Sequence, residues 1–147
     1  MRTPAELTEA FRARGWKNTP QRQLLFRLLH GNDSHPSAEA LYALAHEQMP
    51  GISRRTVYQT LSELAALGEL RPLALGGATR FDPNTEPHHH AQCDQCGTLL
   101  DVYVRNTDAL RVEGLYGFTP TSATIVFSGR CVACANLSTP TPKEQLP

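Results

Sequence analysis

The sequence predicts an α+β protein made of two parts, an N-terminal winged helix-turn-helix domain and a small C-terminal α/β domain. Three observations lead to this class. Several stretches with helical periodicity precede a hairpin centred on two glycines. The periodicity changes after Asp82, where short strand-like runs follow. All four cysteines lie in this second part, in two Cys-x-x-Cys pairs.

Four amphipathic helices are expected before residue 70. Residues 4–14 form the first, and the second has Pro20 at its first position and a buried leucine stripe. A serine or threonine precedes three of the helices, where its side chain accepts from a free backbone N–H, and glycine follows two of them, where it allows the backbone to leave the helix. The expected caps are Thr19, Ser37 and Ser53, and the expected ends are Gly15 and Gly68.

The fourth helix has one apolar side and one polar side. The apolar side carries Val57, Leu61 and Leu64. The polar side carries residue types that bind phosphates and read base edges, as on a helix that enters a DNA major groove. These residues are Arg54, Arg55, Tyr58, Gln59 and Ser62. Residues 70–75 and 78–81 then form a hairpin around Gly76 and Gly77, which completes a winged helix.

Basic residues are concentrated locally, although the formal net charge is zero. Residues 10–30 hold five basic residues and no acidic one, and residues 51–62 hold Arg54 and Arg55 with no acid. Zero net charge excludes a global field that attracts nucleic acid, so any attraction must come from these clusters. Either cluster alone is also compatible with an ordinary solvated helix face.

The four cysteines indicate a structural zinc site. Cys93 and Cys96 form one pair, and Cys131 and Cys134 form the other. Two Cys-x-x-Cys turns supply the four thiolates of a closed tetrahedral site. The alternatives are a redox dithiol or two disulfides. Two pairs on turn-like frames favour zinc over redox chemistry, and nothing indicates secretion, which disfavours disulfides.

A second group of potential ligands lies between Asp82 and Cys96, where a carboxylate and three histidines precede the first cysteine pair. This density predicts another metal site. A zinc hydrolase or deaminase would use such a cluster, but the deaminase signature requires a Glu two residues after its histidine, and position 90 is His. Four thiolates also leave no open position on zinc. The sequence therefore does not predict an enzyme.

The second part is expected to contain strands at residues 98–104 and 121–127 and a short helix at residues 107–115. It is too thin to fold without zinc or a partner subunit. The predicted boundaries are a winged-helix domain at 1–82, a hinge at 83–87, a zinc-binding domain at 88–136 and a disordered tail at 137–147. No apolar run is long enough to be a signal peptide or a membrane span, so a cytoplasmic location is expected.

Five ordered motifs resemble the ferric uptake regulator (Fur) family of bacterial metal-dependent repressors, over about residues 7–135. The resemblance implies a homodimer, a C-terminal dimerisation domain and a DNA-binding winged helix. The motifs are Thr19 to Arg22, His35 to Tyr42, Ile52 to Leu61, His88 to Gly97 and Gly129 to Cys134.

The resemblance also implies a regulatory metal site of three imidazoles and two carboxylates, formed by His35, Asp82, His88, His90 and Asp101. Such a nitrogen and oxygen set suits Fe(II) or Mn(II). Asp at both carboxylate positions is similar to the peroxide-sensing, PerR-like branch, whereas zinc-sensing relatives tend to carry Cys at position 82. In that branch the ligands that peroxide oxidises correspond to His35 and His88. A manganese- or iron-uptake regulator without peroxide sensing is the alternative.

Some relatives have a further metal site, but this chain has Ala123 where they have a histidine, and Pro87 and His89 replace other ligands. We therefore expect two metals per chain and a solvent-facing His89 without a role. On the DNA side, Tyr58 and Gln59 are expected to read bases. The resemblance implies an AT-rich inverted repeat as the operator. The full set of predicted DNA contacts is Lys17, Arg22, Arg54, Arg55, Thr56, Tyr58 and Gln59.

Overall fold

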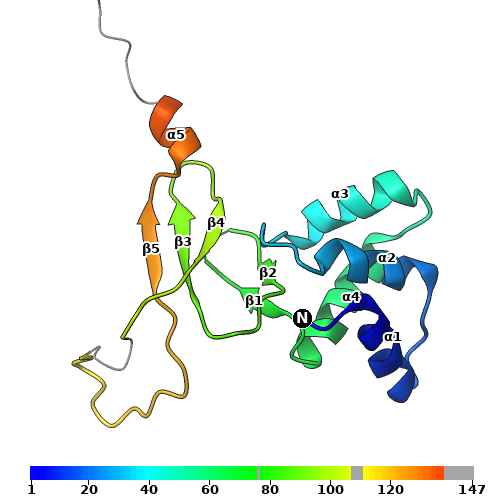
Figure 1. Ribbon diagram of the computed structural model, residues 1–147, viewed down its shortest axis with the longest axis horizontal. Helices are drawn as coiled ribbons and strands as arrows, with labels where there is room; N and C mark the ends of the chain where they lie inside the picture. The colour runs from blue at the N-terminus through cyan, green and yellow to red at the C-terminus, as the bar shows by residue number, and fades with distance from the viewer. Residues whose placement is uncertain (76, 107–110, 138–147) are drawn as a thin grey trace, which may run out of the picture. The chain divides into compact units, whose positions relative to one another are not determined.

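The computed structural model describes residues 1–75, 77–106 and 111–137 of the 147 residues. The chain forms two compact units, Met1–Glu86 and Pro87–Pro147. Each unit has its own secondary structure (Figure 1). None of the helices in the described part of the chain combines the length and the apolar character needed to cross a membrane.

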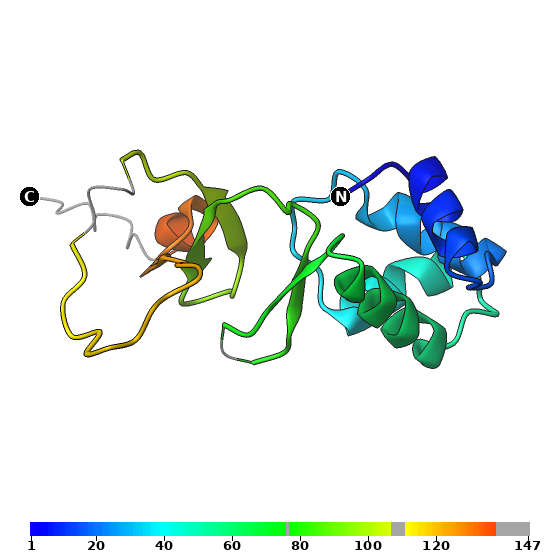
Figure 2. The same cartoon turned by 90° about the horizontal axis from the view of Figure 1, so that it is seen from below.

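The first unit contains four helices followed by a two-stranded antiparallel sheet. The helices form one group in both views (Figures 1 and 2). In the sheet, Arg71 pairs with Asp82 and Leu73 with Arg80. The unit is the winged helix that the sequence predicts. Its elements are α1 (Pro4–Ala13), α2 (Pro20–Leu29), α3 (Ala38–Gln48), α4 (Arg54–Ala66), β1 (Arg71–Leu73) and β2 (Arg80–Asp82).

The predicted helix caps are confirmed. The side chains of Thr19, Ser37 and Ser53 each accept a hydrogen bond from the backbone N–H three residues later, at 3.4, 3.1 and 3.1 Å. Gly15 and Gly68 follow α1 and α4 with φ of 70° and 72°, a conformation that glycine adopts without steric cost. These local signals set the ends of the helices independently of the core.

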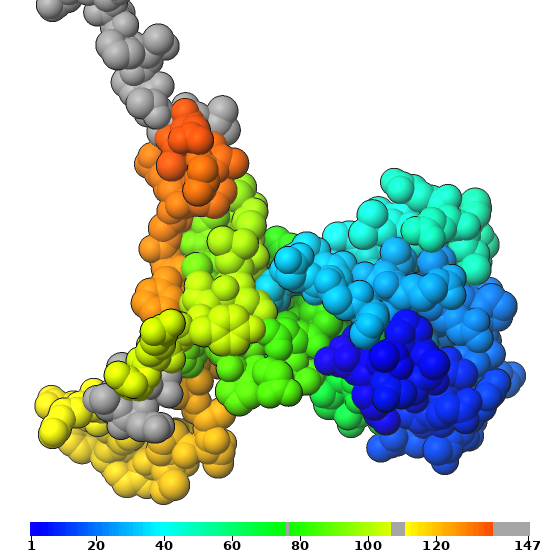
Figure 3. Space-filling view, viewed as in Figure 1, coloured from blue at the N-terminus to red at the C-terminus, as the bar shows by residue number. Residues whose placement is uncertain are grey.

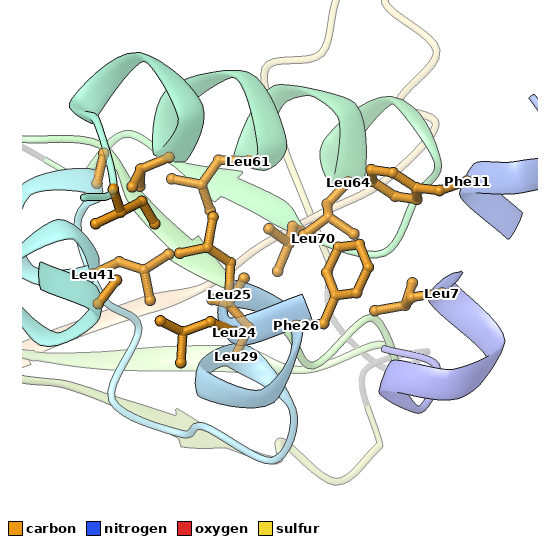
Figure 4. Close-up of a cluster of buried hydrophobic side chains, with 14 residues drawn as sticks. Leu7, Phe11, Leu24, Leu25, Phe26, Leu29, Leu41, Leu61, Leu64 and Leu70 are labelled. Atoms are coloured by element: carbon orange, nitrogen blue, oxygen red, sulfur yellow. The ribbon is translucent and has the colours of Figure 1, made fainter. Parts of the chain in front are cut away.

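The core of the first unit consists of side chains from all four helices (Figure 4). Phe11 and Phe26 pack edge to face with ring centroids 4.9 Å apart. Val57, Leu61 and Leu64, the apolar side predicted for α4, are all buried. This packing turns the polar side of α4 outward.

The second unit contains a three-stranded sheet in the order β4-β3-β5. The central strand β3 (His89–Cys93) pairs antiparallel with β4 (Leu99–Val102) and parallel with β5 (Val126–Gly129). The short helix α5 (Val132–Leu137) follows β5 directly (Figure 1). The α/β character predicted for this part is confirmed.

Several predicted details of the second unit differ from the structure. The strands expected at 98–104 and 121–127 are shorter or shifted, and β3 and α5 were not predicted. The helix expected at 107–115 is wrong for residues 111–115, because Gly114 adopts a left-handed φ of 87° that ends any regular helix. Residues 107–110 lie outside the described residues. So does the predicted tail, except for Leu137 at the end of α5.

Residues 111–125 form an exposed segment without helix or strand. In the space-filling view they extend away from the strands of the second unit (yellow to light orange, Figure 3). Val112, Tyr116 and Phe118 are large apolar residues in this segment, and Tyr116 is 98% exposed. Exposed apolar side chains in this number mark a surface suited to association.

We predict that Leu61→Ala destabilises the protein by about 2–5 kcal/mol, because the leucine is fully buried and the substitution leaves a cavity. Urea unfolding followed by circular dichroism measures this change. Leu44→Ala is the matched control, since Leu44 lies on α3 but is 43% exposed. Equal losses for the two variants would contradict the packing described for α4.

Candidate metal centres

The two cysteine pairs lie at the C-terminal ends of the parallel strands β3 and β5. Cys93 ends β3, and Cys96 lies in the turn that follows, where the N–H of Gly97 donates to the carbonyl of Cys93 at 2.9 Å. Cys131 directly precedes α5, and Cys134 lies in its first turn. The parallel pairing of β3 with β5 places Cys93 opposite Gly129, and this brings the second pair to the first.

Their sulfur atoms all lie within 4.8 Å of one another. The Sγ atoms of Cys96 and Cys131 are 3.7 Å apart. A tetrahedral zinc ion with Zn–S bonds of about 2.3 Å separates its sulfurs by about 3.8 Å. All four thiols are free rather than joined as disulfides. The cluster therefore fits a four-thiolate zinc ion, as the sequence predicts.

Backbone and side-chain donors already stabilise thiolates in this cluster. The N–H groups of Cys131 and Cys96 lower the pKa of Cys93 to about 6, and the Thr98 hydroxyl lowers the pKa of Cys96. The neighbouring thiols of Cys131 and Cys96, together with burial, raise the pKa of Cys134 to about 12. Four thiolates in this space would repel one another, and a bound cation that displaces the remaining thiol protons would remove that repulsion.

In the first unit, His35 and Asp82 form a buried pair. Their Nε2 and Oδ1 atoms are 3.7 Å apart. His35 lies in the loop between α2 and α3 with a φ of 49°, which is uncommon for a non-glycine residue and is typical of functional sites. Two contacts hold this loop against β2: the Phe81 N–H donates to the Pro36 carbonyl at 3.0 Å, and Arg80 donates to the His35 carbonyl at 3.4 Å.

In the second unit, His88, His90 and Asp101 lie together. His90 on β3 pairs in register with Asp101 on β4. The Nε2 atoms of His88 and His90 are 3.0 Å apart, and Nε2 of His88 is 3.4 Å from Oδ1 of Asp101. Two nitrogen ligands at right angles, each about 2.1 Å from a metal, lie about 3.0 Å apart. The two imidazoles are therefore spaced as adjacent ligands of one ion.

The prediction that His89 faces solvent is wrong. Its side chain is buried, and its Nδ1 accepts a hydrogen bond from the N–H of Ile125 at 3.3 Å. The physical reason is the position of His89 on β3, the central strand of the sheet, which the sequence pattern does not predict. His89 thus links β3 to the segment that leads into β5.

The predicted DNA contacts are exposed, with two exceptions. Arg54, Arg55, Tyr58 and Gln59 are exposed on α4, and Lys17 is exposed in the loop before α2. Thr56 is half-buried, and its hydroxyl lies 2.9 Å from that of Ser53 at the start of α4. The second exception, Arg22, is only 8% exposed.

Two glutamates on this face were missed. Glu39 accepts from Arg54 at 3.1 Å and lies 3.4 Å from the Tyr58 hydroxyl. Glu63 accepts from Arg22 and from Gln59. The signal that identifies Glu63 is its position four residues after Gln59, which places both side chains on one helix face.

A model of the ferric uptake regulator family matches residues 13–128. The chain belongs to this family. Its members are transcriptional regulators rather than enzymes, and the chain is accordingly a metal-binding regulator of the Fur family. The family assignment confirms the prediction from the sequence that the chain is not an enzyme.

Individual Fur-family relatives cover most of the chain. The peroxide-responsive repressor PerR of Staphylococcus epidermidis is 31% identical over 132 residues, 88% of each chain. A zinc-bound manganese uptake regulator has a TM-score of 0.71 and 26% identity, over 89% of this chain and all of the other. The Helicobacter pylori ferric uptake regulator has a TM-score of 0.74 at 21% identity, over 89% and 90%, and supports the fold alone.

We predict that Cys96→Ser lowers the zinc content of the purified protein and the melting temperature of the second unit, because a hydroxyl does not replace a thiolate ligand. Elemental analysis and thermal unfolding measure the two changes. Gln95→Ala is the control, since Gln95 is an exposed neighbour in the same turn. A Cys96→Ser protein with full zinc and unchanged melting would contradict the four-cysteine assignment.

Proposed function

We propose that the chain is a metal-dependent, dimeric transcriptional repressor that binds operator DNA with Fe(II) or Mn(II) as co-repressor and is released when peroxide oxidises a histidine ligand. The observation that carries this proposal is a thiolate-free set of imidazoles and carboxylates, all buried except the partly exposed Asp101, in a chain of the Fur family. The proposed ligands of the regulatory ion are His35, Asp82, His88, His90 and Asp101.

The donor chemistry supports Fe(II) or Mn(II) at these residues. Three imidazole nitrogens and two carboxylate oxygens suit divalent iron and manganese, while the four thiolates elsewhere in the chain suit zinc. The same protein can thus hold zinc in one site and a different metal in the other. Positions 82 and 101 carry aspartates and not cysteines, so this site has no thiolate that would favour zinc.

A single ion bound by all five residues would make DNA binding depend on metal. His35 and Asp82 belong to the first unit, and His88, His90 and Asp101 belong to the second. Such an ion would fix the orientation of the winged helix in each subunit of a dimer, and operator binding requires the two reading helices to match half-sites one helical turn or a multiple apart. By linkage, DNA must tighten metal binding by the same factor.

The surfaces of the two units support the remaining parts of the proposal. The exposed polar side of α4 suits the major groove, with Tyr58 and Gln59 at base edges and Arg54 and Arg55 on phosphates. The exposed apolar residues of the second unit suit a dimer interface. An AT-rich inverted repeat as the operator and a cytoplasmic location complete the proposal.

Peroxide sensing is supported by the carboxylates at positions 82 and 101 and by the relative from Staphylococcus epidermidis, which is named a peroxide-responsive repressor. Bound Fe(II) would activate the O–O bond of hydrogen peroxide, which is the two-electron oxidant: one oxygen atom is added to an imidazole and the other leaves as water. His35 and His88 are the imidazoles proposed to gain an oxygen atom. A ligand oxidised in this way binds the ion less well, so the repressor leaves its operator.

The second candidate function is a manganese- or iron-uptake regulator without peroxide sensing. The 26% identity and the TM-score of 0.71 to a manganese uptake regulator favour it. Both candidates use the same ligands and the same DNA-binding face. They differ in whether peroxide changes the protein.

We predict that Asp82→Ala leaves the fold intact but removes metal-dependent DNA binding, because the regulatory ion loses a buried carboxylate ligand. Fluorescence anisotropy with duplexes selected from a random pool, with and without Mn(II), measures the effect. Asp33→Ala is the control, since Asp33 is an exposed carboxylate of the same unit. Unchanged affinity of Asp82→Ala in Mn(II) would exclude Asp82 as a ligand.

We predict that a brief low dose of peroxide adds about 16 Da to His35 or His88 in the Fe(II)-loaded protein and not in the Mn(II)-loaded protein. Intact-mass spectrometry followed by peptide mapping locates the added oxygen. If iron-loaded protein keeps unmodified histidines and still binds DNA, the uptake regulator replaces the peroxide sensor as the function.

A further inference from the structure

The side chain of Arg22 directs its donors into the protein. Its Nη2 lies 2.6 Å from Oε2 and 2.9 Å from Oε1 of Glu63, and its Nη1 donates to the carbonyl of Lys17 at 2.7 Å. The guanidinium also lies over the ring of Phe11, 5.3 Å from its centroid. Both side chains of the ion pair are largely buried, at 10% and 15% exposure. A phosphate contact needs an exposed guanidinium fork, and this one is occupied.

The same ion pair reaches two residues proposed to touch DNA. At one end, Arg22 holds the backbone of Lys17 through its carbonyl. At the other end, Oε1 of Glu63 accepts a hydrogen bond from Nε2 of Gln59 at 3.0 Å. Lys17, Gln59 and the ion pair line one groove of about 450 Å³ on the first unit. The network therefore runs from the loop before α2 to the reading side of α4.

Glu63 determines which end of the Gln59 amide faces it. A carboxylate is only an acceptor, so the amide must present its NH₂ group to Glu63, and its carbonyl oxygen then lies at the other end. An exposed glutamine without such a partner can rotate its amide by 180° at little cost. The two orientations offer different hydrogen-bonding patterns to a base edge, and direct readout depends on that pattern.

We propose that Arg22 and Glu63 are positioning residues for operator recognition: the ion pair fixes the Gln59 amide in one orientation and the Lys17 loop in one place, and Arg22 itself binds no phosphate. This role rests on the proposed DNA-binding function. It explains how the protein would distinguish its operator from other DNA sequences. Arg22 supplies the counter-charge for the largely buried Glu63 carboxylate.

The decisive variant is Glu63→Gln. It removes a negative charge from the proposed DNA-binding side, so electrostatics alone makes it bind every duplex as tightly as before or more tightly. The positioning role has the opposite consequence for selectivity, because a glutamine at position 63 both donates and accepts and so no longer fixes the Gln59 amide. We expect the ratio of affinities for a selected and a scrambled duplex to fall about tenfold, the usual size of one base contact.

The measurement uses full-length protein loaded with Mn(II) and duplexes selected by the wild-type protein from a random pool. Glu9→Gln is the matched control, since it removes the same charge from an exposed ion pair on α1. Glu63→Gln in a Gln59→Ala background tests the route, because an effect that acts through Gln59 disappears there. If Glu63→Gln fails to fold, Glu63→Asp keeps the charge, shortens the reach to Gln59 and is expected to lose the same discrimination.

Arg22→Gln separates positioning from phosphate binding. The logarithm of the affinity falls linearly with the logarithm of the salt concentration, and each lost phosphate contact makes this slope less steep by about 0.9 per subunit. We expect that decrease for Arg55→Gln and an unchanged slope for Arg22→Gln, with reduced discrimination between duplexes. A slope for Arg22→Gln that falls as in Arg55→Gln, or a Glu63→Gln protein that discriminates like wild type, overturns the positioning role.

The wild-type measurement distinguishes this failure from failure of the proposed function. If the wild-type protein, loaded with Mn(II) or Fe(II), selects no duplex over a scrambled one, operator binding and the positioning role are overturned together. Wild-type selectivity that Glu63→Gln retains overturns the positioning role alone.

Discussion

The second unit depends on holding four sulfur atoms within 4.8 Å of one another. Among its described residues, the buried apolar side chains are Leu99 and two of the ligand cysteines, Cys93 and Cys134. Three short strands and a helix of 6 residues bury too little apolar surface to offset the entropy of folding. A metal ion bound by the four thiolates would take the place of a hydrophobic core. The strand order suits such a site, because β5 lies beside β3 and brings the second cysteine pair to the first.

The first unit is stabilised differently, by a continuous core of buried side chains from four capped helices. This difference explains why the sequence predicts the elements of the first unit more accurately than those of the second. Helix caps and apolar stripes are local signals. Thr19, Ser37 and Ser53 therefore marked the starts of α2, α3 and α4, and the apolar stripes marked their buried sides. In the second unit the local signals are weak. Three of the five residues of the strand β3 are ligand types, two histidines and a cysteine. The left-handed glycine at 114 interrupts a stretch whose composition favours a helix.

The candidate metal sites show the same limit. The spacing of the cysteines was sufficient to predict one closed site, because each Cys-x-x-Cys turn is a local unit. The proposed nitrogen and oxygen ligands are scattered over residues 35 to 101. The density of potential ligands indicated a site near Asp82, His88 and His90, and only the resemblance to a family added His35 and Asp101. The structure adds three features that the sequence does not predict. They are the left-handed backbone at His35, the close approach of His88 to His90, and the burial of His89, the neighbour of His90 on β3.

Two glutamates next to the proposed DNA-contacting residues differ in exposure, and exposure determines what each can do. Glu39 and Arg54 form an ion pair in which both side chains are more than half exposed, so solvent screens the pair and a phosphate can replace the carboxylate at little cost. Glu63 and Arg22 are largely buried, and separating such a pair costs about 3–5 kcal/mol because it leaves an uncompensated charge. A DNA phosphate can therefore exchange with Glu39 but not with Glu63. The exposed pair keeps Arg54 available on the surface, whereas the buried pair persists in the complex and holds the residues around it in place.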